Sequence, residues 1–344
     1  MIVAVSGIND TENPGPGVGV ARSLKEADAS IRTVGLSYDV QDPGNYMPFV
    51  IDKSYLLTYP SHGWEPIYSR LLYIKHSYGL DAVIPTLDAE LPQYIKYQEE
   101  LRRAGIRTFL PDMERFELRS KENLAEVSER LGITYPKTRR VFNVEQLTRA
   151  VKEIGTPCIV KGNYYKAYKA RSLPEAIYYF TEISNEWGFP ILVQKIVTGD
   201  ELNVIGAGDG EGGVLGLVAI KKLTTTHLGK IWNGVTIRHG RLLEVAEAFV
   251  REYRWRGPFE LECIVDGEEI IMIEINPRFP AWVYFATGAG VNLPKMVLDA
   301  MFGRSVGGKK DYEAGKMMVR YTYETITDIE KLSTLATKGE SDER

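Results

Sequence analysis

Hydrophobic residues in the first third of the chain come in short runs, separated by segments whose apolar residues recur at helical spacing. Residues 2–6 (IVAVS), 31–37 and 81–85 are such runs, and their length and β-branched residues favour buried strands. The remaining stretches predict helices at about 18–27, 65–78 and 89–104, and a last strand at 106–110. Strands that alternate with helices at this spacing favour a parallel, doubly wound sheet.

The middle of the chain is richer in helix and the last third is richer in strand. Helices are predicted at about 120–131, 143–154 and 173–187, with strands at 158–161 and 191–196. Further strands are predicted at 201–207, 213–222, 231–237, 258–265 and 269–275, with helices at 242–254 and 292–303. The tail from residue 336 is small and polar and is expected to fray. The pattern therefore predicts an α/β domain followed by α+β structure.

Composition narrows the class of protein. The 344 residues are 44% hydrophobic with a net charge of −4, which suits two or three domains with large cores and gives no basic surface for nucleic acid. No apolar run reaches the roughly 18 residues of a membrane span, and the N-terminus lacks the pattern of a signal peptide. The two cysteines, Cys158 and Cys263, lie in apolar runs and are expected to be buried thiols in a reducing compartment. We expect a cytoplasmic protein without a nucleic-acid or membrane partner.

Three glycines follow the first strand. Gly15, Gly17 and Gly19 lie between a strand and a helix, where exposed amides can cradle a phosphate. Asp39 ends the second strand, roughly where dinucleotide-binding folds place a ribose-binding acid. The spacing departs from G-x-G-x-x-G because Arg22 stands at the third position. A nicotinamide site, a packing turn and a substrate-facing loop remain open.

Residues 270–278 (IIMIEINPR) carry the strongest chemical signal. On a strand, residues two apart share a face, so Glu274, Asn276 and Arg278 project one way while the isoleucines between them pack the other way. Burying a carboxylate among isoleucines is costly unless a cation accompanies it. The alternative is an edge strand with a solvated polar face.

The preceding strand strengthens the metal interpretation. Residues 259–265 (FELECIV) lead to Asp266-Gly267, a hairpin signal. A three-residue loop at 266–268 would place Glu260 opposite Glu274, with Glu262 one diagonal step away. Carboxylate and amide oxygens that converge in this way suit Mg²⁺ or Mn²⁺. A two-residue turn would reverse the parity, so the interpretation depends on the loop length.

These motifs resemble those of a known superfamily. G-P-F-E-L-E followed by I-E-I-N-P-R resembles the metal-binding strands of ATP-grasp enzymes, most closely the carbamoyl-phosphate synthetase and biotin carboxylase branch. The resemblance covers about residues 1–305 and implies an N-terminal doubly wound parallel-sheet domain followed by an ATP-grasp fold. The implied parts are a Rossmann-like domain (1–112), the N-terminal ATP-grasp part (113–196) with a lid at about 137–195, a metal-binding antiparallel-sheet subdomain (197–310) and a C-terminal strand, helix and polar tail (311–344).

The resemblance assigns the metal site position by position. Glu262, Glu274 and Asn276 match the metal ligands, and Arg278 matches a phosphate-contacting arginine. The separation of twelve between Glu262 and Glu274 suits the family, and Glu260 remains the alternative ligand.

The resemblance also implies a site for ATP. Ser120-Lys121 with Gly132-Ile-Thr-Tyr-Pro136, and Cys158-Ile-Val-Lys161, resemble the segments that carry the two nucleotide lysines. Gln194 stands where many relatives have Glu in the linker whose backbone reads the adenine. The implied nucleotide contacts are Lys121, Lys161, Gln194, Lys195, Ile196 and Glu201, together with one of Lys221 and Lys222, which end a strand and point to opposite faces.

Three features depart from the family or stay open. The lid loop from Gly162 to Lys169 holds only one glycine, whereas this loop is usually glycine-rich in the family. Three explanations remain open: Lys166 or Lys169 supplies the positive charge, the aromatic residues recognise a ligand, or the loop only packs. The expected strand at 279–284 carries bulky rings, which shape an acceptor pocket or fill the core. Asp88 and Glu90 are substrate-side residues or helix caps.

The implied function is an ATP-dependent carboxylate–amine or carboxylate–thiol ligase that forms an acyl phosphate and releases ADP and phosphate. Its partners are a small-molecule acid and an amine, and a homodimer is common in the family. The alternatives are a bicarbonate-using carboxylase or carbamoyl-phosphate-type enzyme, a non-catalytic nucleotide-binding protein, and a nicotinamide-dependent enzyme. The sequence does not identify the acid or its acceptor.

Overall fold

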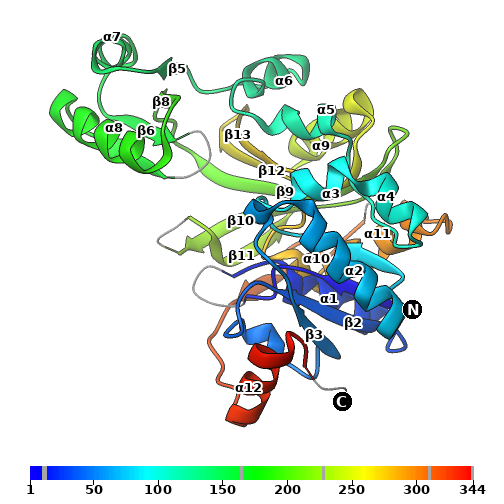
Figure 1. Cartoon of the computed structure of the whole chain (residues 1–344). Coiled ribbons are helices and arrows are strands. Elements are labelled where there is room, and N and C mark those ends of the chain that lie inside the picture. Colours follow the sequence, from blue (N-terminus) through cyan, green and yellow to red (C-terminus); the bar gives the residue numbers. More distant parts are fainter. Residues whose placement is uncertain (10–13, 163–165, 227–228, 309–310, 342–344) are drawn as a thin grey trace. The chain divides into compact units, whose positions relative to one another are not determined.

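The structure is a computed structural model that describes residues 1–9, 14–162, 166–226, 229–308 and 311–341 (Figure 1). The chain divides into two compact units. The first comprises Met1–Glu117, Leu202–Leu261 and Ile275–Arg344, and the second comprises Leu118–Glu201 and Glu262–Glu274. Among the described residues, no helix combines the length and the apolarity that crossing a bilayer requires.

The N-terminal part of the first unit contains a four-stranded sheet in the order β3-β2-β1-β4. The strands are β1 (Ile2–Val5), β2 (Arg32–Ser37), β3 (Lys53–Leu56) and β4 (Ala82–Ile84). All three strand pairs are parallel. The expected parallel sheet is therefore present, and it includes β3, which the polar sequence around it conceals.

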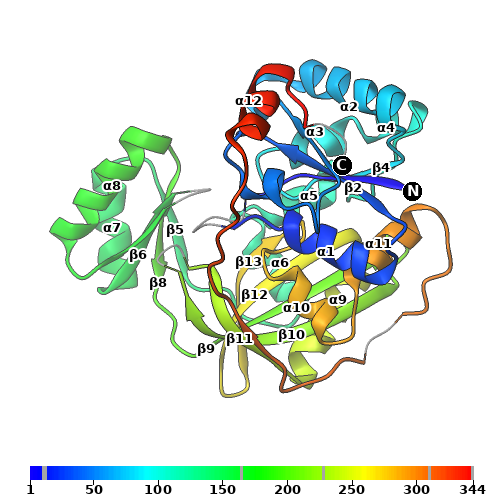
Figure 2. The ribbon, with the colours of Figure 1, turned by 90° about the horizontal axis from the view of Figure 1, so that it is seen from below.

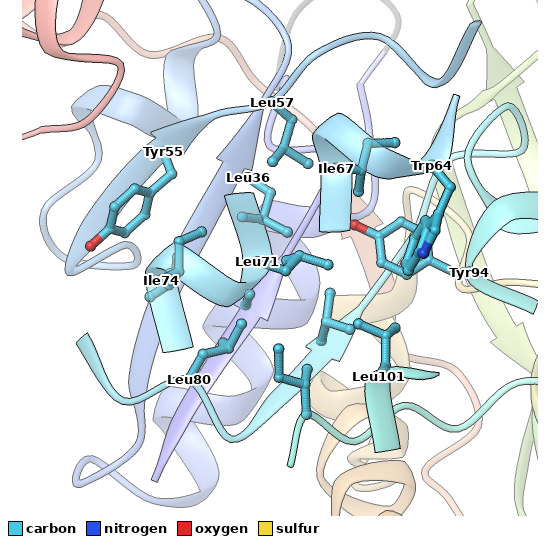
Figure 3. Packing of buried hydrophobic residues seen from close by; sticks show 14 of the residues in the cluster. Leu36, Tyr55, Leu57, Trp64, Ile67, Leu71, Ile74, Leu80, Tyr94 and Leu101 are labelled. Atoms are coloured by element: carbon cyan, nitrogen blue, oxygen red, sulfur yellow. The ribbon is translucent and has the colours of Figure 1, made fainter. Parts of the chain in front are cut away.

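Helices cover both faces of this sheet, as a parallel sheet requires. On one face, Ala4, Leu36 and Tyr55 pack with apolar residues of α2 (Trp64–Tyr78) in one buried cluster (Figure 3). The other face buries Val3 and Val5, which are both 0% exposed, and α1 (Gly17–Ala27) packs there. Short 3₁₀ turns at Pro43–Tyr46 and Pro60–His62 flank β3.

The helix predicted at 89–104 is two helices, α3 (Leu91–Lys96) and α4 (Gln98–Arg103). The break falls at Tyr97, whose ring stacks on Trp64 with centroids 5.0 Å apart. This long-range stacking fixes Tyr97 outside helical geometry and overrides the local periodicity. The strand predicted at 106–110 is also wrong, because only Arg107 forms an isolated bridge, to Ala82.

A six-stranded sheet in the order β13-β12-β9-β10-β11-β14 follows. Its strands are β9 (Asp200–Asp209), β10 (Val214–Thr225), β11 (Ile231–Ile237), β12 (Arg256–Asp266), β13 (Glu269–Asn276) and β14 (Met317–Val319). Helices α9 (Gly240–Tyr253) and α11 (Leu293–Met301) pack against β10. A short helix, α5 (Met113–Phe116), continues into a 3₁₀ turn at Glu117–Arg119.

Residues 279–284 are not the strand expected from their apolar rings. The chain turns after Pro280, which accepts a hydrogen bond from Val283 N, and α10 (Val283–Gly288) begins at once. Proline has no N–H to give to a sheet, which accounts for the turn.

The C-terminal tail is ordered further than expected. Helix α12 spans Ile329–Lys338, and the residues after it bond to the parallel sheet, with Leu56 N donating to Gly339 O and Ser341 N donating to Ser54 O. These bonds satisfy the outer side of β3, so the fraying prediction is wrong for the described part of the tail.

The second unit contains a four-stranded antiparallel sheet in the order β5-β8-β6-β7. Its strands are β5 (Thr138–Val141), β6 (Cys158–Gly162), β7 (Ala167–Ala170) and β8 (Ile191–Lys195). Helices α7 (Val144–Ile154) and α8 (Leu173–Trp187) cover one face (Figures 1 and 2). Each begins at a capping side chain, Asn143 for α7 and Ser172 for α8, as helix N-termini prefer.

The second unit also holds α6 (Leu124–Arg130) and the tip of the β12–β13 hairpin. Thr134 forms a parallel bridge to Ile271, with its N–H donated to Ile270 O and its carbonyl accepting from Met272 N. The segment before the lid sheet is thereby attached to β13. Both cysteines, Cys158 and Cys263, are buried free thiols.

Candidate functional site

The second unit contains two candidate phosphate-binding lysines, Lys121, which is half-buried, and Lys161, which is buried. Lys121 precedes α6 and its Nζ donates to Gly162 O at 2.9 Å. Lys161 lies on β6, is only 7% exposed, and its Nζ donates to Gln194 Oε1 at 2.8 Å. The structure thus brings together two of the sequence-predicted nucleotide residues that lie forty positions apart in the chain.

The electrostatics of this pair favour an anionic ligand. Burial, reinforced by the neighbouring Lys121, lowers the pKa of Lys161 to about 7, while Glu274 opposes the shift. Burial also lowers the pKa of Lys121, and Glu274 again opposes. Two cations held close together in a desolvated place are stabilised by an added negative charge, and a polyphosphate supplies one.

Gln194 positions Lys161. Its amide is 5% exposed, accepts from Lys161 Nζ and donates from Nε2 to Thr138 Oγ1 at 2.8 Å. The side chain is therefore committed to the lid sheet. The predicted contacts to adenine would then come from the backbone of Lys195 and Ile196. The N–H of Lys195 already donates to Lys137 O.

The remaining predicted nucleotide residues lie on β9 and β10. Glu201 is exposed near the start of β9. Lys221 pairs with Leu202 and Val235, and Lys222 pairs with Gly234; both lysines are partly exposed. As successive strand residues they point to opposite faces, so only one of them can serve a given site.

Both candidate lysines of the lid loop lie among the described residues. Lys166 forms an ion pair with Glu186 of α8, and Lys169 lies on β7, paired with Ile159 and exposed. Asn163, Tyr164 and Tyr165 lie outside the described residues. The ion pair at Lys166 supports the packing interpretation for that side chain.

Glu260 binds three side chains of the first unit. It is 3% exposed, and its Oε1 accepts from Asn203 Nδ2 at 2.8 Å and from Trp282 Nε1 at 2.7 Å. Its Oε2 accepts from Asn276 Nδ2 at 3.0 Å. With three N–H donors on its two oxygens, Glu260 is a satisfied buried carboxylate and it orients the amide of Asn276. This engagement favours Glu262, which is half-buried, over Glu260 as a metal ligand.

Arg278 is fixed by three acceptors. Its Nε donates to Asp88 Oδ2 at 3.0 Å, and the two ends of its guanidinium donate to Phe279 O and to Asn276 Oδ1. Asp88, proposed from the sequence as a substrate-side residue or a cap, is therefore an ionic partner of Arg278. The pairing joins the loop after β4 to the end of β13 within the first unit.

Two further cations, Lys230 and Arg320, belong to this group and were missed by the sequence reasoning. Lys230 Nζ donates to Pro14 O at 3.0 Å. The pKa of Lys230 is lowered to about 8, mainly by burial and also by Arg278 and Arg320, while Asp88 and Glu260 oppose the shift. No local motif signals either residue, because Lys230, Arg278 and Arg320 lie more than forty positions apart in the chain. We call Lys230, Arg278 and Arg320 the cation cluster.

The hairpin that carries the predicted metal ligands differs from the expectation in its loop. β12 ends at Asp266 and β13 begins at Glu269, so the loop has two residues and the three-residue prediction is wrong. Glu260 and Asn276 nevertheless share a face, because their side chains bond directly. Alternation along β13 then places Glu274 on the side of Asn276.

The donor set fits a hard cation. Among the described residues, no three His, Cys, Asp or Glu side chains are grouped so that they could hold a metal ion. The predicted ligands Glu262, Glu274 and Asn276 offer two carboxylates and one amide oxygen. Mg²⁺ prefers a few carboxylates completed by water and phosphate oxygens. These three residues could hold it together with a nucleotide.

The N-terminal glycines are explained by packing. Gly17 N donates to Gly7 O and Gly15 N donates to Asn9 O, so both amides are committed to protein carbonyls. A Cβ on Gly17 would stand 2.0 Å from Ser6 O. Glu90, 0% exposed, accepts from Thr86 N at 2.8 Å and from Leu87 N at 3.0 Å, which favours a structural role for it.

The bulky rings after Arg278 also have structural partners. Trp282 is 3% exposed and bonds Glu260. Tyr284 covers the guanidinium of Arg22 at 3.7 Å and donates to Glu26 Oε2. These contacts favour packing over a pocket for an acceptor.

Part of the chain matches a known family model, and its sequence is similar to that of larger enzymes. Residues 189–326 match the family model described as "ATP-grasp in the biosynthetic pathway with Ter operon". The carbamoyl phosphate synthase large chain of Clostridium acetobutylicum is 24% identical over 265 residues, 68% of this chain and 24% of that protein. The one of Saccharolobus islandicus is 26% identical over 199 residues, 53% of this chain and 19% of that protein. The chain thus spans at most about a quarter of the length of these relatives.

Solved structures share the fold over most of the chain. Biotin carboxylase of Campylobacter jejuni, in its β,γ-ATP complex, has a TM-score of 0.70 at 16% identity, covering 92% of this chain and 74% of that one. The biotin carboxylase domain of Hydrogenobacter thermophilus 2-oxoglutarate carboxylase, a dimer with MgADP and bicarbonate, has a TM-score of 0.68 at 19% identity, covering 92% and 73%. N5-carboxyaminoimidazole ribonucleotide synthetase of Thermus thermophilus has a TM-score of 0.64 at 17% identity, covering 90% and 80%. The expected fold class and the resemblance to ATP-grasp enzymes of the carbamoyl-phosphate synthetase and biotin carboxylase branch are confirmed.

Proposed function

We propose that this chain, whose fold is that of the ATP-grasp ligases, is an ATP-dependent ligase that activates a small carboxylic acid as an acyl phosphate and transfers the acyl group to an amine. The observation that carries the proposal is the pair Lys121 and Lys161, both influenced by Glu274. Glu274 lies on the strand that continues into Asn276 and ends beside Arg278. Strand β13 thus carries Glu274, whose charge acts on both lysines, and ends at the amide of Asn276.

In the proposed reaction, Lys121 and Lys161 hold the phosphates of ATP, and Gln194 keeps Lys161 in place. Glu262, Glu274 and Asn276 would hold Mg²⁺, which would offset the negative charge of the phosphates when bound. Glu260 orients Asn276, and Asp88 orients Arg278, whose guanidinium stabilises the charge that develops on the transferred phosphoryl group.

The chemistry has two steps. An oxygen of the substrate carboxylate attacks the γ-phosphorus, the bond to the bridging oxygen breaks, and ADP leaves with the electron pair. The amine nitrogen then attacks the acyl carbon, the acyl–oxygen bond breaks, and inorganic phosphate leaves while the amine loses a proton. A thiol acceptor would follow the same course and give a thioester.

The nucleotide product tests the class of reaction. A screen of acids and amines with Mg·ATP should yield ADP and phosphate only when both an acid and an acceptor are present. Glu274→Gln should abolish the release, while Glu268→Gln, on the exposed turn of the same hairpin, should leave it unchanged. Formation of AMP and pyrophosphate, or equal activity in both variants, would refute the proposal.

A bicarbonate-using carboxylase or carbamoyl-phosphate-type enzyme is the second candidate, because the similar proteins carry those names. Bicarbonate alone should then stimulate ADP release. An organic acid that stimulates release when bicarbonate has been removed favours the first candidate.

A further inference from the structure

An exposed, apolar segment joins β14 to α12 in the first unit. Residues 317–327 run as a long extended trace between them (Figures 1 and 2). Its large side chains face water: Met317 is 61% exposed, Val319 58%, Tyr321 and Tyr323 76% each, and Ile326 95%. Exposed large apolar side chains gathered along one segment are typical of an interaction site.

The segment is held at both ends, so its exposure is not that of a loose terminus. At the start, β14 pairs antiparallel with β11, Met317 opposite Val235 and Val319 opposite Asn233. At the far end, α12 buries Leu335, and Ser341 N bonds Ser54 O. Between these anchors, residues 320–327 belong to no helix or strand.

The sequence of the segment nevertheless favours a strand. It reads MMVRYTYETIT, without glycine or proline and with six β-branched or aromatic residues among its last seven, which are typical of paired strands. β14 is the outer strand of its sheet among the described residues, and an outer strand offers backbone groups for pairing with another chain. The segment therefore has the composition and the place of a strand that awaits a partner.

The order of the residues identifies that partner, because the segment is complementary to itself. Arg320-Tyr321-Thr322-Tyr323-Glu324 reads as a palindrome in chemical character around Thr322. We propose that two copies of this chain associate through antiparallel pairing of residues 317–327 about a two-fold axis at Thr322. A self-complementary patch is what a two-fold dimer requires.

In this register the central pairs, from Arg320 to Glu324, are favourable. The pairs are Arg320 with Glu324, Tyr321 with Tyr323, Thr322 with Thr322, Val319 with Thr325, Met318 with Ile326, and Met317 with Thr327, each joining the two copies. Opposite charges, aromatic pairs and threonine pairs each stabilise neighbouring strands by about 0.2–1 kcal/mol.

Charge also selects this register over its neighbours. Moving the axis to Tyr321 would place Met318 opposite Glu324, and moving it to Tyr323 would place Arg320 opposite Ile326. Either shift leaves a charge against an apolar side chain. Arg320 Nη2 already donates to Ala281 O at 3.1 Å, but a guanidinium carries five N–H donors, so it can bond a glutamate as well.

The inference does not depend on the proposed reaction, and charge-swapped variants test it. The wild-type chain of 38.7 kDa should sediment as a dimer at micromolar concentration. Arg320→Glu opposes two glutamates and Glu324→Arg opposes two arginines, so each alone should weaken the dimer at least tenfold. Mixing the two variants restores both opposite-charge pairs and should restore the dimer; a mixture that stays monomeric, or a monomeric wild type, overturns the proposal.

A cysteine at the axis tests the register without altering charge. Thr322→Cys should form an intermolecular disulfide on mild oxidation, because the two copies of residue 322 stand opposite one another. Thr325→Cys is the matched control: the two copies of residue 325 would stand six positions apart along the strands, about 20 Å, and should stay reduced. A dimer in which Thr322→Cys does not cross-link, or in which both variants cross-link equally, contradicts the proposed pairing.

Discussion

At the scale of single residues, two glutamates on β12 differ in what surrounds them rather than in chemistry. Glu260 is buried and accepts from Asn203, Asn276 and Trp282, whereas Glu262, two positions later, is half-buried. The first holds other side chains in place, and the second is proposed to bind a cation. Spacing alone could not separate these roles, because both residues lie on the same face of the strand.

Alanine at each position should separate the roles by stability. Glu260→Ala leaves three buried N–H donors without an acceptor, and each unsatisfied donor costs about 1–3 kcal/mol, so the free energy of unfolding should fall by about 3 kcal/mol or more. Glu262→Ala should change it by less than about 0.5 kcal/mol and yet abolish ATP turnover. Chemical denaturation and an ADP assay on both variants check this; equal loss of stability would contradict the assignment.

The lowered pKa of Lys161 predicts how the stability of the protein depends on pH. Its pKa of about 7 lies below the usual 10.5, so between these values the unfolded chain binds a proton that the folded chain does not. The free energy of unfolding should therefore rise with pH from about 7 to 10.5 through this group, and Lys161→Met should remove that part of the rise.

ATP should reverse the protonation of the same lysine. Phosphate charge favours the ammonium form, so binding at pH 8.5 should take up about one proton, measured by calorimetry in buffers of different ionisation enthalpy. Lys161→Met should abolish the uptake and Lys169→Met, on the exposed strand of the lid, should keep it. Uptake that is unchanged in Lys161→Met would place the phosphates elsewhere.

At the scale of elements, the turn between β1 and α1 is shaped by close backbone packing. Gly17 has no room for a side chain, because a Cβ would stand 2.0 Å from Ser6 O. Gly240, the first residue of α9, has nothing within 4 Å of the same position. The two glycines therefore differ in what they contribute to the fold.

Alanine at these two sites should act in opposite directions. Gly17→Ala forces the backbone of β1 and α1 apart and should lower the free energy of unfolding by about 3 kcal/mol. Gly240→Ala should raise it by about 0.4–1 kcal/mol, because the unfolded chain loses freedom. Thermal unfolding of the two variants checks the prediction. If Gly17→Ala does not lower the stability, the packing explanation is wrong and a ligand-binding role of this turn is again open.

The sequence predicted the elements whose pattern is local. The alternation around β1, β2 and β4 and the apolar faces of α2, α7 and α8 are readable, since each is set by neighbours a few residues away. The break at Tyr97 is not, because it follows from stacking on Trp64, over thirty positions earlier. Strand β3 was not predicted for a similar reason, since it is stabilised by a bond from Leu56 to Gly339, far away in the chain.

The residues of the site also differ in whether a local motif reveals them. Lys121, Lys161 and the carboxylates of the hairpin follow from motifs, whereas Lys230 and Arg320 join Arg278 only when distant segments meet. The roles of Gln194 and Asp88 as supports also required their contacts, since an amide and an acid in those motifs suggest ligand binding equally well.

At the scale of the whole molecule, the proposed reaction passes the γ-phosphate of ATP to an oxygen of the acid. The fold alone does not determine the acid, and the relatives that share it carry names of different reactions. The measurement must therefore follow the oxygen atoms rather than the identity of the product.

The direct test uses the acid that stimulates ADP release, labelled with ¹⁸O in its carboxylate. Transfer through an acyl phosphate predicts that one ¹⁸O appears in the inorganic phosphate for each ADP formed, as measured by mass spectrometry. Phosphate that carries no label while ADP still forms would contradict the acyl phosphate and, with it, the proposed ligase mechanism.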